Sequence, residues 1–292
     1  MAGKEVSYKM EEILDKFSKA VEKYVRPQTY PIAIKMLTSE EEVPEKALRP
    51  TKDFKHRVAI CQGFALARRW GLSMAILKDD NYCPFAAINL GFYKPPKFYF
   101  DGNVALGYYA KNLEAGAKLE KAVFRFKTGQ YAGLAIAPLS TANFEPDVIA
   151  IYGNSMQMMR LVNAYLWNKG GRLENSVTAR AACTEVIPKT ILTKECGVVI
   201  PCYGEREWGM TSDDELIFTA PTSKLSDITE GLEGSYKYGA RIIARSNLSW
   251  EAGMFEPYDK LSEMLGIPYK KEVLEWARTL EIPRTRKSDP KR

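Results

Sequence analysis

Apolar residues recur along this chain with two periods, which together predict a mixture of helices and strands. Apolar positions spaced three and four residues apart predict helices over 4–24, 56–70 and 155–169. Shorter apolar runs, bounded by turn residues, predict strands at 31–36, 72–77, 131–137, 147–152, 172–178, 198–200 and 215–220. Further helices are predicted at 108–118, 181–192, 224–232, 236–245, 258–265 and 270–280. We therefore expect an α+β fold with mixed sheets and packed helices.

The order of these elements occurs twice, which suggests two related lobes from an internal duplication. Each copy has a strand, a helix that ends at a glycine, a second strand, a cysteine, and a third strand that ends in Ala-Pro. The first copy spans 32–140 and the second 149–223. Chance recurrence of common elements is the alternative. If the duplication is real, a ligand is expected in a cleft between the lobes.

This repeat divides the chain into four parts. They are an N-terminal helix over 1–30, a first α/β lobe over 31–145, a second α/β lobe over 146–250, and C-terminal helices with a basic tail over 251–292.

Composition narrows the class of protein. Of the 292 residues, 46% are hydrophobic, 11% aromatic and 27% charged, which is typical of globular proteins and excludes a disordered chain. No run of 18 apolar residues is present, so no membrane helix is expected. The first residues lack the apolar segment of a secretory signal, so we expect a cytoplasmic protein.

The net charge is +6, and half of this excess lies in the residues 281–292. A basic tail can bind nucleic acid. No aromatic residues are interleaved with these charges, so we expect a solvated tail and no nucleic-acid partner.

The chain has a single histidine, His56. A zinc site with two histidines is therefore excluded within one chain, and any triad would need His56. We expect His56 to be an ordinary residue of the 56–70 helix. Glycine-rich phosphate loops are absent, which argues against dinucleotide-binding and P-loop chemistry.

The cysteines are the strongest candidates for chemistry. Glycine or proline flanks Cys83, Cys196 and Cys202, and such loops can direct backbone N–H groups at a sulfur ligand. Cys183 lies near a predicted helix start, where the thiol pKa would be lowered. Four separated thiolates could hold an iron–sulfur cluster or a zinc ion. Buried cysteines without a metal are the third interpretation.

Several segments around these cysteines resemble the family called domain of unknown function 169, from archaea and anaerobic bacteria. The segments are Cys61-Gln62-Gly63-Phe64-Ala65, Cys83-Pro84-Phe85-Ala86-Ala87, Ala137-Pro138-Leu139, Asn154-Ser155-Met156-Gln157, Ala182-Cys183-Thr184-Glu185 and Cys202-Tyr203-Gly204-Glu205-Arg206. The resemblance covers about 31–245. It implies that Cys61, Cys83, Cys183 and Cys202 belong to the family pattern, whereas Cys196 is extra. It favours a [4Fe-4S] cluster and supplies no reaction.

Four polar residues are candidates for binding the cofactor or a ligand. Arg206 and Arg68 could each offset the charge of a cysteine-ligated cluster or hold an anionic ligand, and a surface arginine is the alternative for both. Gln62 and Gln157 occupy matching places in the proposed repeat and could contact a ligand there. Surface glutamines are the alternative.

These observations predict an iron–sulfur protein with an electron-transfer or redox role, whose cluster is held by cysteines from both lobes. The alternative is a non-redox protein that binds a small ligand, or zinc, and has structural cysteines. The expected partners are a redox protein, a small anionic ligand or a second copy of the chain, without a membrane. The sequence leaves open whether the protein is an enzyme.

Overall fold

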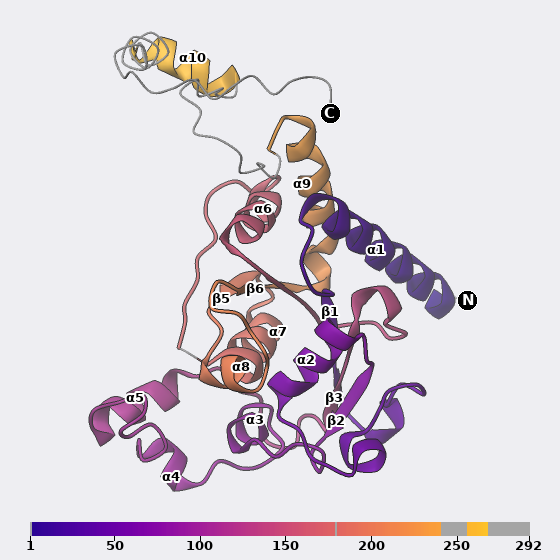
Figure 1. Ribbon diagram of the computed structural model, residues 1–292, viewed down its shortest axis with the longest axis vertical. Helices are drawn as coiled ribbons and strands as arrows, with labels where there is room; N and C mark the ends of the chain where they lie inside the picture. The colour runs from indigo at the N-terminus through magenta and orange to yellow at the C-terminus, as the bar shows by residue number, and fades with distance from the viewer. Residues whose placement is uncertain (1, 179, 241–255, 268–292) are drawn as a thin grey trace, which may run out of the picture. The chain divides into compact units, whose positions relative to one another are not determined.

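The computed structural model describes residues 2–178, 180–240 and 256–267. Its centre is a six-stranded sheet with the order β2-β3-β1-β4-β6-β5 (Figure 1). The strands are β1 (Ile32–Leu37), β2 (Met74–Leu77), β3 (Gly133–Pro138), β4 (Val148–Gly153), β5 (Gly197–Val199) and β6 (Leu216–Pro221). Every pair is antiparallel. The α+β prediction is confirmed, although one antiparallel sheet replaces the mixed sheets that we expected.

Both faces of this sheet are buried, which explains why its strands read as continuous apolar runs. Successive side chains of a strand point to opposite faces. Ile32 and Ile34 therefore join one apolar cluster, and Ala33 joins another on the opposite side. All residues of β3 and β4 are buried.

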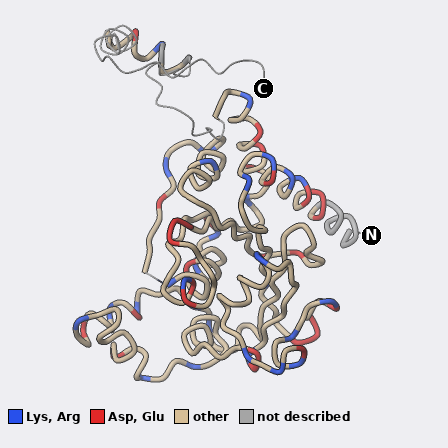
Figure 2. Tube along the Cα trace, in the orientation of Figure 1, with Lys and Arg blue, Asp and Glu red and all other residues tan. Residues whose placement is uncertain are grey.

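One face is covered by α1 (Ala2–Tyr24), α6 (Ser155–Leu166) and α9 (Leu225–Lys237) (Figure 1). At the contact between α6 and α9, a Cβ atom on Gly231 would lie 2.1 Å from the carbonyl oxygen of Ala164, so a side chain cannot fit there. On α1, basic and acidic residues are interleaved and form pairs such as Lys16–Glu12 (Figure 2).

The opposite face carries shorter helices, and it is the face with the candidate cysteines. These helices are α2 (Ile60–Trp70), α3 (Pro84–Asn89), the π-helical segment η4 (Ala181–Lys189), α7 (Thr190–Thr193) and α8 (Tyr203–Glu207). The helices α4 (Lys97–Phe100) and α5 (Leu113–Ala122) pack on each other and project from the sheet (Figure 1).

The remaining short segments are η1 (Glu40–Glu42), the π-helical η2 (Pro50–Phe54), η3 (Leu139–Thr141) and η5 (Thr222–Lys224). The described residues 256–267 belong to a second unit and contain α10 (Glu256–Met264). The helix predicted at 270–280 and the basic tail lie outside the described residues. None of the described helices is long and apolar enough to cross a membrane.

The two halves of the sheet have the same strand order. In each half, the first strand lies at the centre, the third beside it and the second at the edge. Both third strands end in Ala-Pro and run into a 3-10 turn, η3 or η5. However, α2 and α6, which we expected to correspond, cover opposite faces of the sheet. The duplication therefore stays a prediction.

Four of the predicted elements differ clearly from the structure. The helix predicted at 108–118 begins only at Leu113, and over the described part of 236–245 the chain leaves the helix after Lys237, where α9 ends. Residues 172–178 form no strand, because this extended segment pairs with no other strand, although Asn175 donates to the Val198 carbonyl. The helix predicted over 56–70 begins only at Ile60, which leaves His56 in an exposed turn before it.

Candidate functional site: a cluster of four thiols

Four cysteines lie near the starts of four separate helical segments. Cys61 is the second residue of α2, and Cys183 is the third residue of η4. Cys83 and Cys202 immediately precede α3 and α8. All four are partly buried, and all four segments belong to the same side of the sheet.

The four thiols lie close enough to affect one another's ionisation. Burial raises the pKa of the Cys61 thiol far above its usual range, and the charges of Glu205, Cys202, Cys183 and Cys83 act in the same direction. Burial likewise raises the pKa of Cys183, again with contributions from Cys83 and Cys202. The fold therefore brings together four thiols that are widely separated in the sequence. The lowered pKa that we expected for Cys183 is wrong, because burial outweighs its place near a helix start.

Local hydrogen bonds hold two of these cysteines in place. Asn81 accepts a hydrogen bond from the Cys83 backbone N–H at 3.2 Å, and its amide donates to the Cys83 carbonyl at 2.9 Å. Around Cys202, backbone N–H groups of Ala181, Gly204 and Glu205 favour the thiolate and partly oppose the rise in its pKa that burial causes. Gly204, which flanks Cys202 one residue away, is one of these three groups.

Beside Cys183 lies a buried shell of hydrogen-bond donors. The nearby side-chain amide of Asn89 and the positive charge of Arg180 both favour the Cys183 thiolate. Arg180 pairs with buried Glu120 at 2.6 Å, and its guanidinium lies 3.8 Å from the ring centroid of Tyr109. Nδ2 of Asn89 and Nε of Arg180 have no hydrogen-bond partner among the described residues. Buried polar atoms are normally paired, so these donors are available to an acceptor.

A second buried network lies beside Cys61 and Cys202. The carboxylate of Glu205 accepts hydrogen bonds from Tyr152 at 2.9 Å and from Thr211 at 3.2 Å. Burial raises the pKa of Glu205 to about 7. The guanidinium of Arg68 lies 4.0 Å from the Tyr152 ring centroid and thus continues the network away from the thiols.

Arg68 is fully buried, which the surface interpretation of this arginine did not anticipate. It pairs with Glu215 at 2.9 Å and donates to the backbone carbonyls of Met210 and Gly209. Its charge is therefore compensated by Glu215. Arg206, the other arginine considered, lies on α8 and contacts Asp213 at 3.3 Å.

The two candidate glutamines have capping roles. Gln62 accepts a hydrogen bond from the Ala59 N–H at the start of α2, and Gln157 accepts one from the Asn154 N–H at the start of α6. The side chain of Gln157 also donates to the Arg26 carbonyl at 2.6 Å. Because α2 and α6 cover opposite faces, the structure does not bring these glutamines together as a pair.

Cys196 lies apart from the four thiols. It is buried in the apolar cluster on the face covered by α1, α6 and α9, where burial raises its pKa to about 12. Among the described residues, no three His, Cys, Asp or Glu side chains are arranged so that they could hold a single metal ion.

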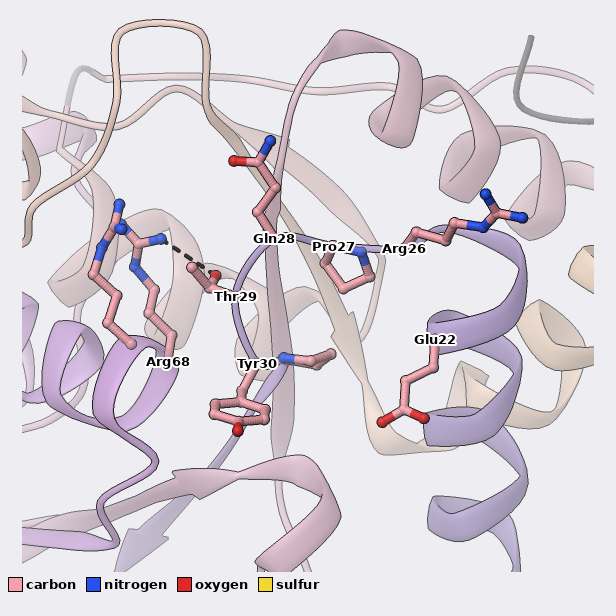
Figure 3. Close-up of a pocket in the computed structure, with 9 residues that line it drawn as sticks. Glu22, Arg26, Pro27, Gln28, Thr29, Tyr30 and Arg68 are labelled. Carbon is pink, nitrogen blue, oxygen red and sulfur yellow. Dashed lines mark hydrogen bonds between the residues drawn. The ribbon is translucent and has the colours of Figure 1, made fainter. Parts of the chain in front are cut away.

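A hollow of about 600 Å³ lies between the ends of α1 and α2 (Figure 3). Glu22 and Arg26 lie on one side of it, and Arg68 reaches Thr29 on the other. Acidic and basic groups both line or border this hollow, and Glu215 already neutralises Arg68 and Arg69.

Four residues beside the thiols were not predicted from the sequence, namely Asn89, Arg180, Tyr152 and Glu205. Of these, Glu205 could have been identified from the sequence, because it follows Cys202 within a segment that carries the family resemblance. The others are distant in sequence from the cysteines that they accompany, so only the fold could identify them.

Comparison with known proteins gives a family without a known activity. The family model for domain of unknown function 169, described as an uncharacterised ArCR family, matches residues 20–231. An uncharacterised protein of Methanocaldococcus jannaschii, MJ0308, is 28% identical over 206 residues, which cover 69% of this chain and 86% of the relative. No solved structure matches the chain. The matched region contains all four thiols of the site.

Proposed function

The chain belongs to the family called domain of unknown function 169, and we propose that it binds a [4Fe-4S] cluster with an electron-transfer or redox role. The proposed ligands are Cys61, Cys83, Cys183 and Cys202. The observation that carries the proposal is the gathering of these four thiols, from four separate helical segments, on one face of the sheet.

The chemistry of the donors supports this assignment. Thiolates are the usual ligands of iron–sulfur clusters. The raised pKa values of Cys61, Cys183 and Cys202 mean that these thiols are protonated at neutral pH in the protein without metal. A bound cation deprotonates a ligating thiol, so cluster assembly here would release protons and relieve the cost of burying the thiolates together.

The surrounding polar atoms also fit. The sulfide ions of a cluster are hydrogen-bond acceptors, and hydrogen bonds to sulfur tune its potential. The unpartnered donors Asn89 Nδ2 and Arg180 Nε belong to residues that already favour the Cys183 thiolate. Donors on the protein would thus stabilise the negative charge that four thiolates and the sulfides bring.

The cluster would supply one-electron transfer. With four cysteine ligands the iron atoms are fully ligated, and electron transfer is the expected role. If only three cysteines ligate, an open iron could act as a Lewis acid on a substrate. A redox partner protein, a small anionic ligand, a homo-oligomer and a cytoplasmic location remain part of this proposal, since five free cysteines suit a reducing compartment.

The test is metal and sulfide analysis of protein purified without oxygen. We expect iron and acid-labile sulfide in near-equal amounts, with visible absorbance that bleaches on reduction. Cys83→Ser and Cys202→Ser should each lower the iron content strongly. Cys196→Ser is the matched control and should leave it unchanged, because Cys196 lies on the opposite face.

Other outcomes would refute the proposal. Colourless protein with one zinc per chain would identify a structural zinc site. Protein without metal after anaerobic cluster reconstitution would identify the cysteines as structural, in a non-redox protein.

A further inference from the structure

Two hollows meet at the surface beside Cys83. One, of about 760 Å³, is lined by Lys55, His56, Arg57, Val58, Gln62 and Tyr82. The other, of about 330 Å³, has Arg57, Tyr82, Cys83, Pro84, Ile88 and Lys94 in its lining. Arg57 and Tyr82 line both, and these volumes are typical of sites for small molecules.

The charges along these linings have one sign. Lys55, Arg57 and Lys94 are exposed, and no carboxylate lines either hollow. Within the described chain, no salt bridge is formed by Arg57 or Lys94, whereas Arg68 and Arg69 beside the hollow of Figure 3 share Glu215. The two joined hollows therefore favour an anion more than that third hollow does.

The basic turn is held in place by the structure beneath it. Buried Asp80 accepts hydrogen bonds from the Arg49 side chain at 2.6 Å and from the Thr51 N–H at 3.0 Å. The Val58 N–H donates to the Asp80 carbonyl at 2.9 Å, and the Tyr82 N–H donates to the Val58 carbonyl at 3.2 Å. The backbone next to Arg57 is thus tied to the segment that carries Tyr82, so little backbone ordering would be needed on binding.

The smaller of the two hollows also offers an apolar surface. Pro84, Ala87 and Ile88 line it, and the ring of Tyr82 packs edge-on against Trp208 with centroids 6.1 Å apart. Exposed aromatic rings next to a guanidinium fork suit a ligand with a flat organic part and a carboxylate or phosphate group.

We propose that the joined hollows bind a small organic anion, with its acidic group at Arg57 and Lys94 and its flat apolar part against Tyr82 and Pro84. Because Cys83 lines the same hollow, this ligand would lie next to the thiol cluster. Only a redox role of this ligand rests on the proposed function, because anion binding itself needs no cluster.

Calorimetric titration at low ionic strength tests the proposal, with phenyl phosphate and benzoate as probes. The two probes distinguish a phosphate from a carboxylate ligand, and benzyl alcohol is the neutral control. We expect saturable binding of at least one anion, about one per chain, and at least tenfold weaker binding of benzyl alcohol. Arg57→Gln should weaken anion binding roughly tenfold, as the loss of one charge-assisted hydrogen bond predicts. Lys94→Gln should weaken it in the same direction.

The matched control is Arg172→Gln. It removes the same charge from a side chain that is 85% exposed and that lines neither hollow, so affinity should stay within about twofold. The proposal is wrong if neither anion binds saturably, or if benzyl alcohol binds as tightly as the anions. It is also wrong if Arg57→Gln and Arg172→Gln weaken binding equally. Binding of polyglutamate without binding of either small anion would also overturn it, in favour of an acidic protein partner.

Iron is measured in the same samples. Protein that contains iron but binds no anion refutes only this inference. Protein that binds the anion but holds no iron after anaerobic reconstitution refutes only the cluster.

Discussion

Replacing Arg68 with methionine should destabilise the protein strongly. Arg68 is fully buried, and its partner Glu215 retains only 10% side-chain exposure. The substitution removes the ion pair at 2.9 Å, the hydrogen bonds to the Met210 and Gly209 carbonyls, and the contact with the Tyr152 ring. It leaves the Glu215 carboxylate buried without its main partner. Breaking a buried pair in this way costs about 3–5 kcal/mol of unfolding free energy.

The neighbouring residue provides a matched control. Arg69 also faces Glu215, but its nearest approach is 3.6 Å and its side chain is 29% exposed. Arg69→Met should therefore cost roughly 0–1 kcal/mol. A second variant tests the cause, because Arg68→Met combined with Glu215→Leu removes both charges. This double variant should recover part of the loss, although the Ser212 N–H then loses its acceptor.

The assay is urea unfolding followed by circular dichroism, supported by thermal scans. At about 2–4 °C per kcal/mol, Arg68→Met should lower the melting temperature by roughly 6–20 °C. The reasoning fails if Arg68→Met costs less than about 1 kcal/mol, or no more than Arg69→Met. It also fails if the double variant is less stable than Arg68→Met alone, since the uncompensated carboxylate would then not be the cause.

Three further variants test other parts of the structure, by the same unfolding methods and, for the last, by thiol reactivity as well. Gly231→Ala should lower the unfolding free energy by about 1–3 kcal/mol, because the new Cβ atom would meet the Ala164 carbonyl, even though alanine favours a helix more than glycine does. The exposed control Ser226→Ala should change the unfolding free energy little. Although burial acts to raise the Asp80 pKa, its hydrogen bonds hold that pKa below the usual value. The protein should therefore exceed the Asp80→Asn variant in unfolding free energy by a constant amount above about pH 4, and this difference should shrink as the pH falls further. A difference that stays unchanged down to pH 2 would contradict this. Cys196→Ala should leave unfolding cooperative and the thiol reactivity of the other face unchanged; altered reactivity there would mean that the two faces are coupled.

Local patterns in the sequence determined the class of fold and most of its elements. A run of apolar residues such as Ile149–Ile151 needs only its own composition to predict a buried strand. The end of α2 at Gly71 was equally local, since Gly71 adopts a left-handed conformation with φ of 73° that suits glycine. The choice of Cys61, Cys83, Cys183 and Cys202 came from their flanking residues and the family resemblance.

Tertiary structure alone decided which elements meet. Strand pairing such as Ile32 with Ala150 depends on contacts between distant segments, which no local pattern encodes, and it merged the two expected lobes into one sheet. The same pairing placed α2 and α6 on opposite faces, and so separated Gln62 from Gln157. Burial of Arg68 was invisible in the sequence for a similar reason, because its partner Glu215 comes from a segment far along the chain. Burying a charged side chain is costly unless its charge is compensated, and for Arg68 the fold supplies the compensating carboxylate of Glu215.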